Sequence, residues 1–167
     1  MDEVVVVNER DEIIGSMPKV EAHRNGTQHR IAVVYVLNKK SEFVVQHRAD
    51  GYLDHSAAGH VDVDETYEEA AKRELFEELG IKDVNLKRIG HGTTKNERYP
   101  DSISSHTFDI FSCVAEPGAL QTKEVKDIFW SKPDSILKDM KESPEKYCEG
   151  FKVSLPILVS SLSLSKD

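Results

Sequence analysis

The sequence predicts one domain of the α/β (α+β) class, in which layers of strands and helices pack together over residues 1–167. Segments of β-branched residues alternate along the chain with segments of helical periodicity, which is typical of mixed layers. The length suffices for one hydrophobic core but leaves no room for a second domain of ordinary size. Apolar residues make up 38% of the chain and charged residues 31%, a composition typical of globular proteins.

The first third of the chain is predicted to form two hairpins and two loops. The paired strands are Val4–Asn8 with Ile13–Gly15, and Ile31–Leu37 with Glu42–His47. Residues 31–37 are nearly all apolar and mostly β-branched, which indicates a strand covered on both faces. The polar segments Lys19–Gln28 and Asp50–His60 carry glycine and are predicted to be loops, the second with room for a short strand.

The clearest helix is predicted over Thr66–Leu79. Thr66 and Glu69 have the spacing of a capping box, and Gly80 is a typical helix stop. An apolar stripe at helical spacing predicts the face that packs on the core. The remaining predicted elements are strands over Val84–Ile89, Thr107–Val114 and Glu124–Trp130, and a helix over Pro133–Met140.

Charge and composition exclude several classes of function. The 22 basic and 30 acidic residues give a net charge of −8, and aromatic residues make up 7%, so we expect no nucleic-acid partner. Cys113 and Cys148 form neither a disulfide framework nor a zinc motif, which predicts a reduced, cytoplasmic protein. The longest charge-free stretch, Val153–Ser165, is too short and too rich in serine to span a bilayer, so we expect no membrane partner.

Three carboxylates on the predicted helix carry the chemistry. Glu74, Glu77 and Glu78 stand at i, i+3 and i+4, which places their Cβ atoms about 5–6 Å apart on one face. Their mutual repulsion is relieved if a cation binds there, and carboxylates without histidine suit Mg²⁺ or Mn²⁺ better than zinc. Arg73, four residues before Glu77, is interpreted as orienting one carboxylate. The alternative is an ordinary solvated acidic face.

The segment Gly59–Ile81 resembles the Nudix box at every position. That pattern is Gly, five residues, Glu65, seven residues, Arg-Glu, an apolar residue, one residue, Glu-Glu, one residue, Gly and an apolar residue. A chance match in a chain of this length is of order one in ten million. The resemblance implies a sandwich with a central mixed sheet between helices. It also implies divalent-metal-dependent hydrolysis of a diphosphate linkage, usually in a nucleoside diphosphate joined to another group.

Transferred residue by residue, the resemblance implies roles for the positions of the box. Four groups would bind Mg²⁺ or Mn²⁺: the carboxylates of Glu74, Glu77 and Glu78 and the carbonyl of Gly59. Glu77 or a nearby carboxylate such as Glu74 would activate water, and Arg73 would hold Glu77 in place. Glu65 would support the turn into the helix or bind a second ion. Such proteins often form homodimers.

A second, narrower resemblance is to isopentenyl diphosphate isomerase, a branch of the same superfamily, over roughly residues 4–136. It rests on Glu21–His23, His29, Gln46–Ala49, Gly59–His60 and Glu124–Trp130. Ala58 stands where that enzyme has its catalytic cysteine, and Thr122 stands where it has a second acidic residue. The sequence is therefore interpreted as a hydrolase of this branch. An isomerase and a nucleotide-binding sensor without catalysis are the alternatives.

The isomerase resemblance adds further candidates outside the box. Its metal-binding histidines match His23, His29 and His60, although the spacing of the first two is one residue shorter here. Arg48 matches an arginine that contacts the diphosphate, so Arg48 and His60 are candidates for substrate binding. Glu124 matches a segment with a metal-binding glutamate and is a candidate for a further metal ligand.

Overall fold

The computed structural model describes residues 2–120 and 122–164, and within these the main sheet contains nine strands. They are β1 (Glu3–Val7), β2 (Ile13–Pro18), β3 (His29–Leu37), β4 (Phe43–Arg48), β5 (Leu53–Asp54), β6 (Ala57–His60), β7 (Lys87–Thr93), β10 (His106–Val114) and β11 (Val125–Ser131). A small separate hairpin consists of β8 (Glu97–Tyr99) and β9 (Ser102–Ser104). The helices are α1 (Lys19–Asn25), α2 (Tyr67–Leu79), α3 (Pro133–Glu142) and α4 (Glu149–Leu164).

Strand β3 lies at the centre of the sheet. Along one edge it pairs in parallel with β10 over its whole length, and β10 pairs antiparallel with β7. The other edge is divided among three antiparallel partners: β1 at His29, β6 from Ile31 to Val34, and β4 at Leu37. The sheet therefore forks on this edge, and the short strand β6 lies between the two arms.

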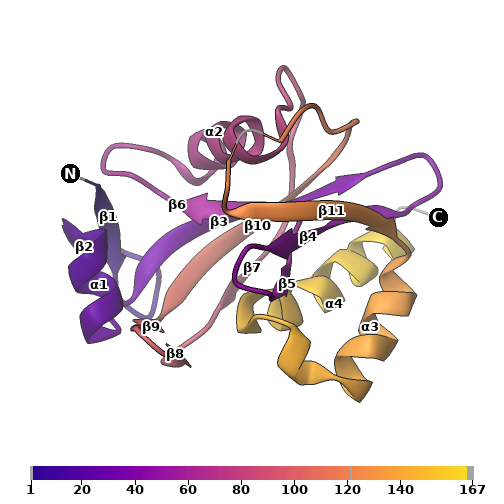
Figure 1. The fold of residues 1–167 in the computed structure, drawn as a ribbon. Coiled ribbons are helices and arrows are strands. Elements are labelled where there is room, and N and C mark those ends of the chain that lie inside the picture. Colours follow the sequence, from indigo (N-terminus) through magenta and orange to yellow (C-terminus); the bar gives the residue numbers. More distant parts are fainter. Residues whose placement is uncertain (1, 121, 165–167) are drawn as a thin grey trace.

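The alternation of side chains on β3 explains the layers. Val34 and its even-numbered neighbours pack in the core beneath α2, whereas Val33 and Tyr35 pack in a second core against α3 and α4. Figure 1 shows α2 on one side of the sheet and α3 and α4 on the other. This arrangement confirms the predicted sandwich with a mixed sheet between helices, and the predicted strand covered on both faces.

Local interactions fix helix α2 where the sequence predicts it. The Thr66 hydroxyl accepts a hydrogen bond from the Glu69 amide at 3.1 Å, and the Glu69 carboxylate accepts one from the Thr66 amide at 3.0 Å. Gly80 ends the helix in the left-handed conformation with φ 67°. Both bonds of the capping box are therefore present, and the predicted helix is confirmed.

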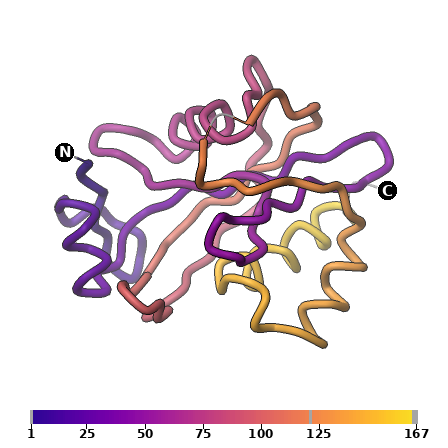
Figure 2. Tube along the Cα trace, viewed as in Figure 1, coloured from indigo at the N-terminus to yellow at the C-terminus, as the bar shows by residue number. Residues whose placement is uncertain are grey.

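Two segments differ from their predictions, and two others form elements for which the sequence analysis makes no prediction. Residues 19–25 of the expected loop form helix α1, which lies beside the β1–β2 hairpin (Figure 2). The strand expected from Val84 begins only at Lys87, and Glu97–Tyr99, where no element is predicted, form strand β8. Most of the charge-free stretch belongs to α4, while its last residue, Ser165, lies outside the described residues.

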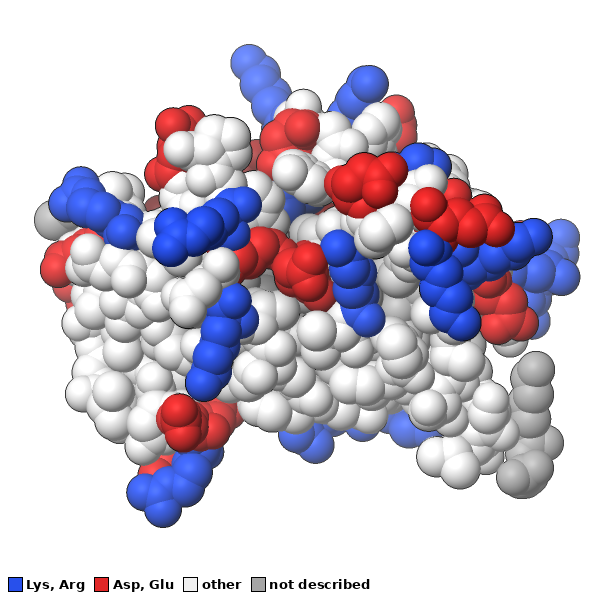
Figure 3. Space-filling model, turned by 90° about the horizontal axis from the view of Figure 1, so that it is seen from below, with Lys and Arg blue, Asp and Glu red and all other residues white. Residues whose placement is uncertain are grey.

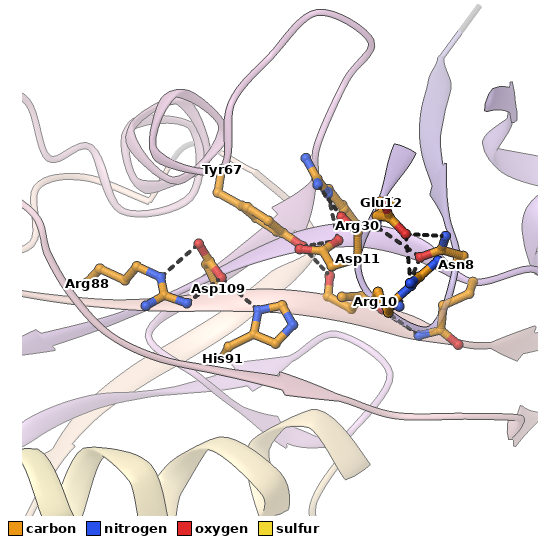
Figure 4. A network of polar contacts seen from close by, with 11 residues as sticks. Asn8, Arg10, Asp11, Glu12, Arg30, Tyr67, Arg88, His91 and Asp109 are labelled. Atoms are coloured by element: carbon orange, nitrogen blue, oxygen red, sulfur yellow. Dashed lines mark hydrogen bonds and ion pairs between the residues drawn. The ribbon is translucent and has the colours of Figure 1, made fainter. Parts of the chain in front are cut away.

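A polar network ties the β1–β2 turn to the sheet and to α2. Asp11, in this turn, accepts hydrogen bonds from Arg30 Nε at 2.8 Å and from the Tyr67 hydroxyl at 2.9 Å and 3.0 Å (Figure 4). The Arg30 guanidinium also lies over the Tyr67 ring, 4.7 Å from its centroid. The network thus joins three elements near the start of α2.

Charged side chains of both signs are interspersed on the face of the molecule that Figure 3 shows. None of the helices in the two described ranges has the length and apolar character needed to cross a membrane. The Cys113 and Cys148 thiols, both within the described residues, are buried and free.

Candidate active site

A cavity of about 1100 Å³ opens beside β6. Side chains from the α2 layer line one part of it, and side chains from α1, β4, β8 and β10 line other parts. Eight of the site residues predicted from the sequence lie on its walls, whereas Glu65 and His29 lie outside its lining; the eight are Arg48, Gly59, His60, Arg73, Glu74, Glu77, Glu78 and Glu124. Residues far apart in the chain therefore converge on one space.

Arg73 organises the carboxylates on this wall. Its guanidinium forms two parallel hydrogen bonds with Glu65, both 2.9 Å long, and donates to Glu74 at 2.7 Å and to Glu77 at 3.4 Å. It also donates to the backbone carbonyl of His60 at 2.8 Å. The contact with Glu77 is the weakest of these, so Arg73 orients Glu65 and Glu74 more firmly than it orients Glu77.

Glu65 supports the turn that leads into α2. Besides binding Arg73, its carboxylate accepts a hydrogen bond from the Asp62 amide at 3.0 Å. The Arg73 guanidinium and this hydrogen bond lower the pKa of Glu65, so the carboxylate stays charged. The loop between β6 and α2 is thereby anchored at the point where the box begins.

Gly59 is required by the close approach of Glu74. A Cβ atom at this position would lie 2.0 Å from Glu74 Cδ and 2.3 Å from its Oε1 atom. Because β6 alternates, the backbone of Gly59 faces the α2 side while His60 points to the opposite face. The absent side chain therefore lets a carboxylate lie directly on the strand.

The three glutamates of the helix face differ in their environment. Glu78 is 7% exposed and accepts hydrogen bonds from Gln46 Nε2 at 2.8 Å and from the Ala58 amide at 3.3 Å. Burial and the nearby carboxylate of Glu74 raise the pKa of Glu78, and burial followed by Glu77 raises that of Glu74. The Glu77 side chain is 53% exposed and is the most accessible to solvent.

Arg48 lies toward another part of the cavity. It forms ion pairs with Asp50 at 2.5 Å and with Asp54 at 3.5 Å. Its guanidinium also lies 5.6 Å from the ring centroid of Tyr52 and 5.7 Å from that of Tyr99. These four neighbours restrict the guanidinium, which suits it to contact an anionic ligand in the cavity.

Glu124 lies on the cavity wall just before β11 and is exposed. It is held there by its backbone, since the Glu124 carbonyl accepts a hydrogen bond from the Ala49 amide at 2.9 Å. Glu124 therefore belongs to the cavity wall although it lies outside the box.

Four histidines converge at the α1 side of the cavity. His23, His29, His60 and His106 each offer a ring nitrogen, and these atoms lie within 4.8 Å of one another. The sequence analysis includes the first three but misses His106. In the sequence it is a histidine directly before the predicted strand Thr107–Val114, and the parallel register of β10 with β3 places it opposite His29.

The chain matches the family model described as the NUDIX domain over residues 27–150. This chain belongs to the Nudix family. A Nudix hydrolase of Pseudomonas aeruginosa is 32% identical over 150 residues, which cover 85% of this chain and 84% of that protein. A protein of Aliivibrio fischeri named isopentenyl-diphosphate Delta-isomerase is 31% identical over 163 residues, covering 89% and 90%.

The fold has similar solved structures. One is a protein of Deinococcus radiodurans with a TM-score of 0.71 and 21% identity, covering 89% of this chain and 93% of that one. Together the relatives place this Nudix protein in the branch that resembles the isomerase. They support a Nudix hydrolase that acts on a pyrophosphate-containing substrate.

Proposed function

We propose that this Nudix protein hydrolyses a diphosphate linkage in a nucleoside diphosphate joined to another group, and that it requires Mg²⁺ or Mn²⁺. The observation that carries the proposal is the organisation of the carboxylates by Arg73. One guanidinium contacts Glu65, Glu74 and Glu77 on the wall of a cavity large enough for a small-molecule substrate.

The donor set fits a hard divalent ion. Glu74, Glu77 and Glu78 supply carboxylate oxygens, and the Gly59 carbonyl supplies a fourth oxygen from the adjoining strand. Burial raises the pKa of Glu74 and Glu78, so these carboxylates lie where a cation would compensate their desolvation. When bound, the metal would screen the diphosphate and lower the pKa of the attacking water.

The side chains have separate roles in this proposal. Glu77, the most exposed of the three, accepts the proton of the water, with Glu74 as the neighbouring carboxylate. Arg73 is a positioning residue that acts through Glu74 and Glu77. Arg48 and His60 contact the substrate, and Glu124, which lines the same cavity from outside the box, supplies a further carboxylate to the metal.

Isomerisation of an allylic diphosphate is the competing activity, because isomerase relatives match this chain closely. Ala58 lies in the cavity beside Glu78, and its methyl group can neither donate nor accept a proton. We therefore expect no solvent proton exchange into isopentenyl diphosphate. Exchange at a rate typical of an enzyme would overturn the hydrolase proposal.

The proposal is tested by product analysis across nucleotide sugars, dinucleoside polyphosphates, coenzyme A, NADH and nucleoside triphosphates, with and without Mg²⁺. We expect metal-dependent cleavage of at least one member. The variant Glu77→Gln should lower kcat at least about 100-fold, because it removes the proton acceptor. Glu68→Gln, on the exposed face of the same helix, is the matched control and should keep wild-type activity.

Two outcomes contradict this proposal. Equal turnover by wild type and Glu77→Gln would exclude the assigned role of Glu77. Tight nucleotide binding without product would favour a sensor.

The cytoplasmic location and the homodimer expected from the sequence stay predictions, which cell fractionation and light scattering would test.

A further inference from the structure

Asp54 supplies a largely buried carboxylate that the proposed function does not use. It ends the short strand β5, which pairs with β4 so that Asp54 lies opposite Gln46. Its side chain is 15% exposed, and it lines the cavity together with Arg48. Burying a carboxylate is costly unless cations or hydrogen-bond donors compensate it, so its neighbours indicate what it does.

One oxygen of this carboxylate is anchored by the protein. Asp54 Oδ1 accepts hydrogen bonds from the Cys148 thiol at 2.9 Å and from the His55 amide at 2.8 Å. The Nδ1 atom of the His55 ring lies 2.6 Å from the same oxygen. Cys148 directly precedes α4, and its amide donates to the Leu53 carbonyl at 3.4 Å. Strand β5 and the start of α4 therefore hold the Asp54 side chain in one orientation.

The other oxygen faces Arg48. Asp54 Oδ2 lies 3.5 Å from Arg48 Nη1, while Asp50 contacts Arg48 Nη2 at 2.5 Å. A guanidinium has five N–H donors, so two ion pairs do not exhaust its capacity to bind a ligand. The Asp50 side chain is 46% exposed, which makes Asp54 the more rigid of the two partners.

The protonation states suit a fixed support. Burial alone would favour the neutral acid, but the contacts with His55, Arg48 and Cys148 outweigh it and lower the pKa of Asp54, so the carboxylate is charged. Burial, followed by this negative charge, raises the pKa of the Cys148 thiol, which therefore stays protonated and can donate. Neither group changes its charge near neutral pH, so the pair is suited to holding a neighbour in place.

Strand β4 connects this support to the glutamates of α2. Gln46 and Arg48 stand two residues apart on β4 and share one face of the strand. Gln46 donates to Glu78 at 2.8 Å, so the next side chain on that face, Arg48, follows directly after the contact with the helix. A diphosphate that reaches the three glutamates would therefore lie within range of the Arg48 guanidinium.

We propose that Asp54 is a positioning residue that fixes the Arg48 guanidinium for contact with the diphosphate of the substrate. The inference rests on the proposed function, in which Arg48 contacts the substrate. Without the carboxylate, the long Arg48 side chain would follow Asp50 toward solvent and would have to be ordered again when the ligand binds. Loss of Asp54 should therefore raise KM and leave kcat nearly unchanged.

The test is equilibrium binding of methylenediphosphonate, a diphosphate analogue with a P–C–P bridge, to the full chain in the presence of Mg²⁺. By calorimetry, Arg48→Ala should raise the dissociation constant at least tenfold and Asp54→Asn at least threefold. Asp83→Asn, the same chemical change at an exposed position outside the cavity lining, is the matched control and should bind as wild type does. With the best substrate of the panel, Asp54→Asn should raise KM at least threefold and keep kcat within twofold.

A double-mutant cycle separates positioning from a general structural effect. If Asp54 acts through Arg48, Asp54→Asn should change the affinity by less than threefold in the Arg48→Ala background. A loss of threefold or more in that background would show that Asp54 supports the cavity wall as a whole, and it would overturn the inference. Tighter binding by Asp54→Asn would also overturn it, because the carboxylate would then only offset the positive charge of Arg48.

The binding assay keeps this inference separate from the hydrolytic proposal. Binding that depends on Asp54 and Arg48 in a protein that hydrolyses no member of the panel would support the inference while hydrolysis fails. Absence of binding by wild type would overturn the inference whatever the panel shows. If Asp54→Asn does not fold, Arg48→Lys decides, because it keeps the charge but loses the planar fork that can contact Asp54 and a ligand together. A loss of affinity of at least threefold then supports the inference, and a smaller loss overturns it.

Discussion

Gly59 is the position in the box where one methyl group would matter most. Gly59→Ala places a Cβ atom 2.0 Å from Glu74 Cδ, so the carboxylate must move off the strand. Displacement of a catalytic group by about 1 Å can cost about 100-fold, so we expect kcat/KM to fall at least tenfold. The measurement is the Mg²⁺-dependent hydrolysis assay on the best substrate of the panel.

A matched glycine variant provides the control. At Gly150 an added Cβ would meet His55 Cε1 at 3.4 Å, an ordinary contact, so Gly150→Ala should keep its activity. Wild-type kcat/KM in Gly59→Ala would show that Glu74 need not lie against the strand, and it would contradict the proposed site.

The site residues differ in how far sequence alone reveals them. The carboxylates of α2 are recognisable because helical spacing puts Glu74, Glu77 and Glu78 on one face and a fixed pattern surrounds them. His106 carries no such pattern, because only the register of two parallel strands brings it beside His29. Local periodicity therefore predicts that the three glutamates of α2 share one face. The cluster of His23, His29, His60 and His106 depends instead on tertiary structure.

At the scale of elements, the capping box of α2 should contribute measurably to stability. Thr66→Ala removes the hydroxyl that accepts the Glu69 amide, which costs about 1 kcal/mol of the free energy of unfolding. For a chain of this length, we expect the melting temperature to fall by about 2–4 °C. Calorimetry measures this change, and Thr66→Ser is the control because it keeps the hydroxyl. Equal destabilisation by both variants would contradict a role for the cap.

Whether the sequence predicts an element depends on how strong its local pattern is. Helix α2 has a cap, an apolar stripe and a terminal glycine, and its bounds are predicted closely. Helix α1 has seven mostly polar residues and one buried alanine, so it has no periodic pattern to detect. Helix α4 is apolar around much of its surface and contains Pro156. A charge-free composition alone does not distinguish such a helix from a buried strand or loop.

At the scale of the whole molecule, the sheet depends on both of its helical covers. The all-apolar pattern of residues 31–37 predicts that β3 is buried on both faces, and α2 and α4 provide these covers. Which segments cover it is not encoded locally, because both faces of the strand are equally apolar. The order of the layers follows from pairing across the chain, above all the parallel contact of β3 with β10.

The docking of α4 on this sheet includes one fully buried polar contact. Tyr35 on β3 and Ser154 on α4 are both fully buried, and their hydroxyl oxygens lie 2.6 Å apart. Ser154→Ala leaves the Tyr35 hydroxyl without this partner, so we expect a loss of about 1–3 kcal/mol in the free energy of unfolding. The double variant Tyr35→Phe with Ser154→Ala removes both polar groups and should lose less than Ser154→Ala alone, as measured by urea denaturation. A double variant less stable than Ser154→Ala would mean that the hydroxyl pair does not couple helix and sheet, and that α4 is held by its apolar contacts alone.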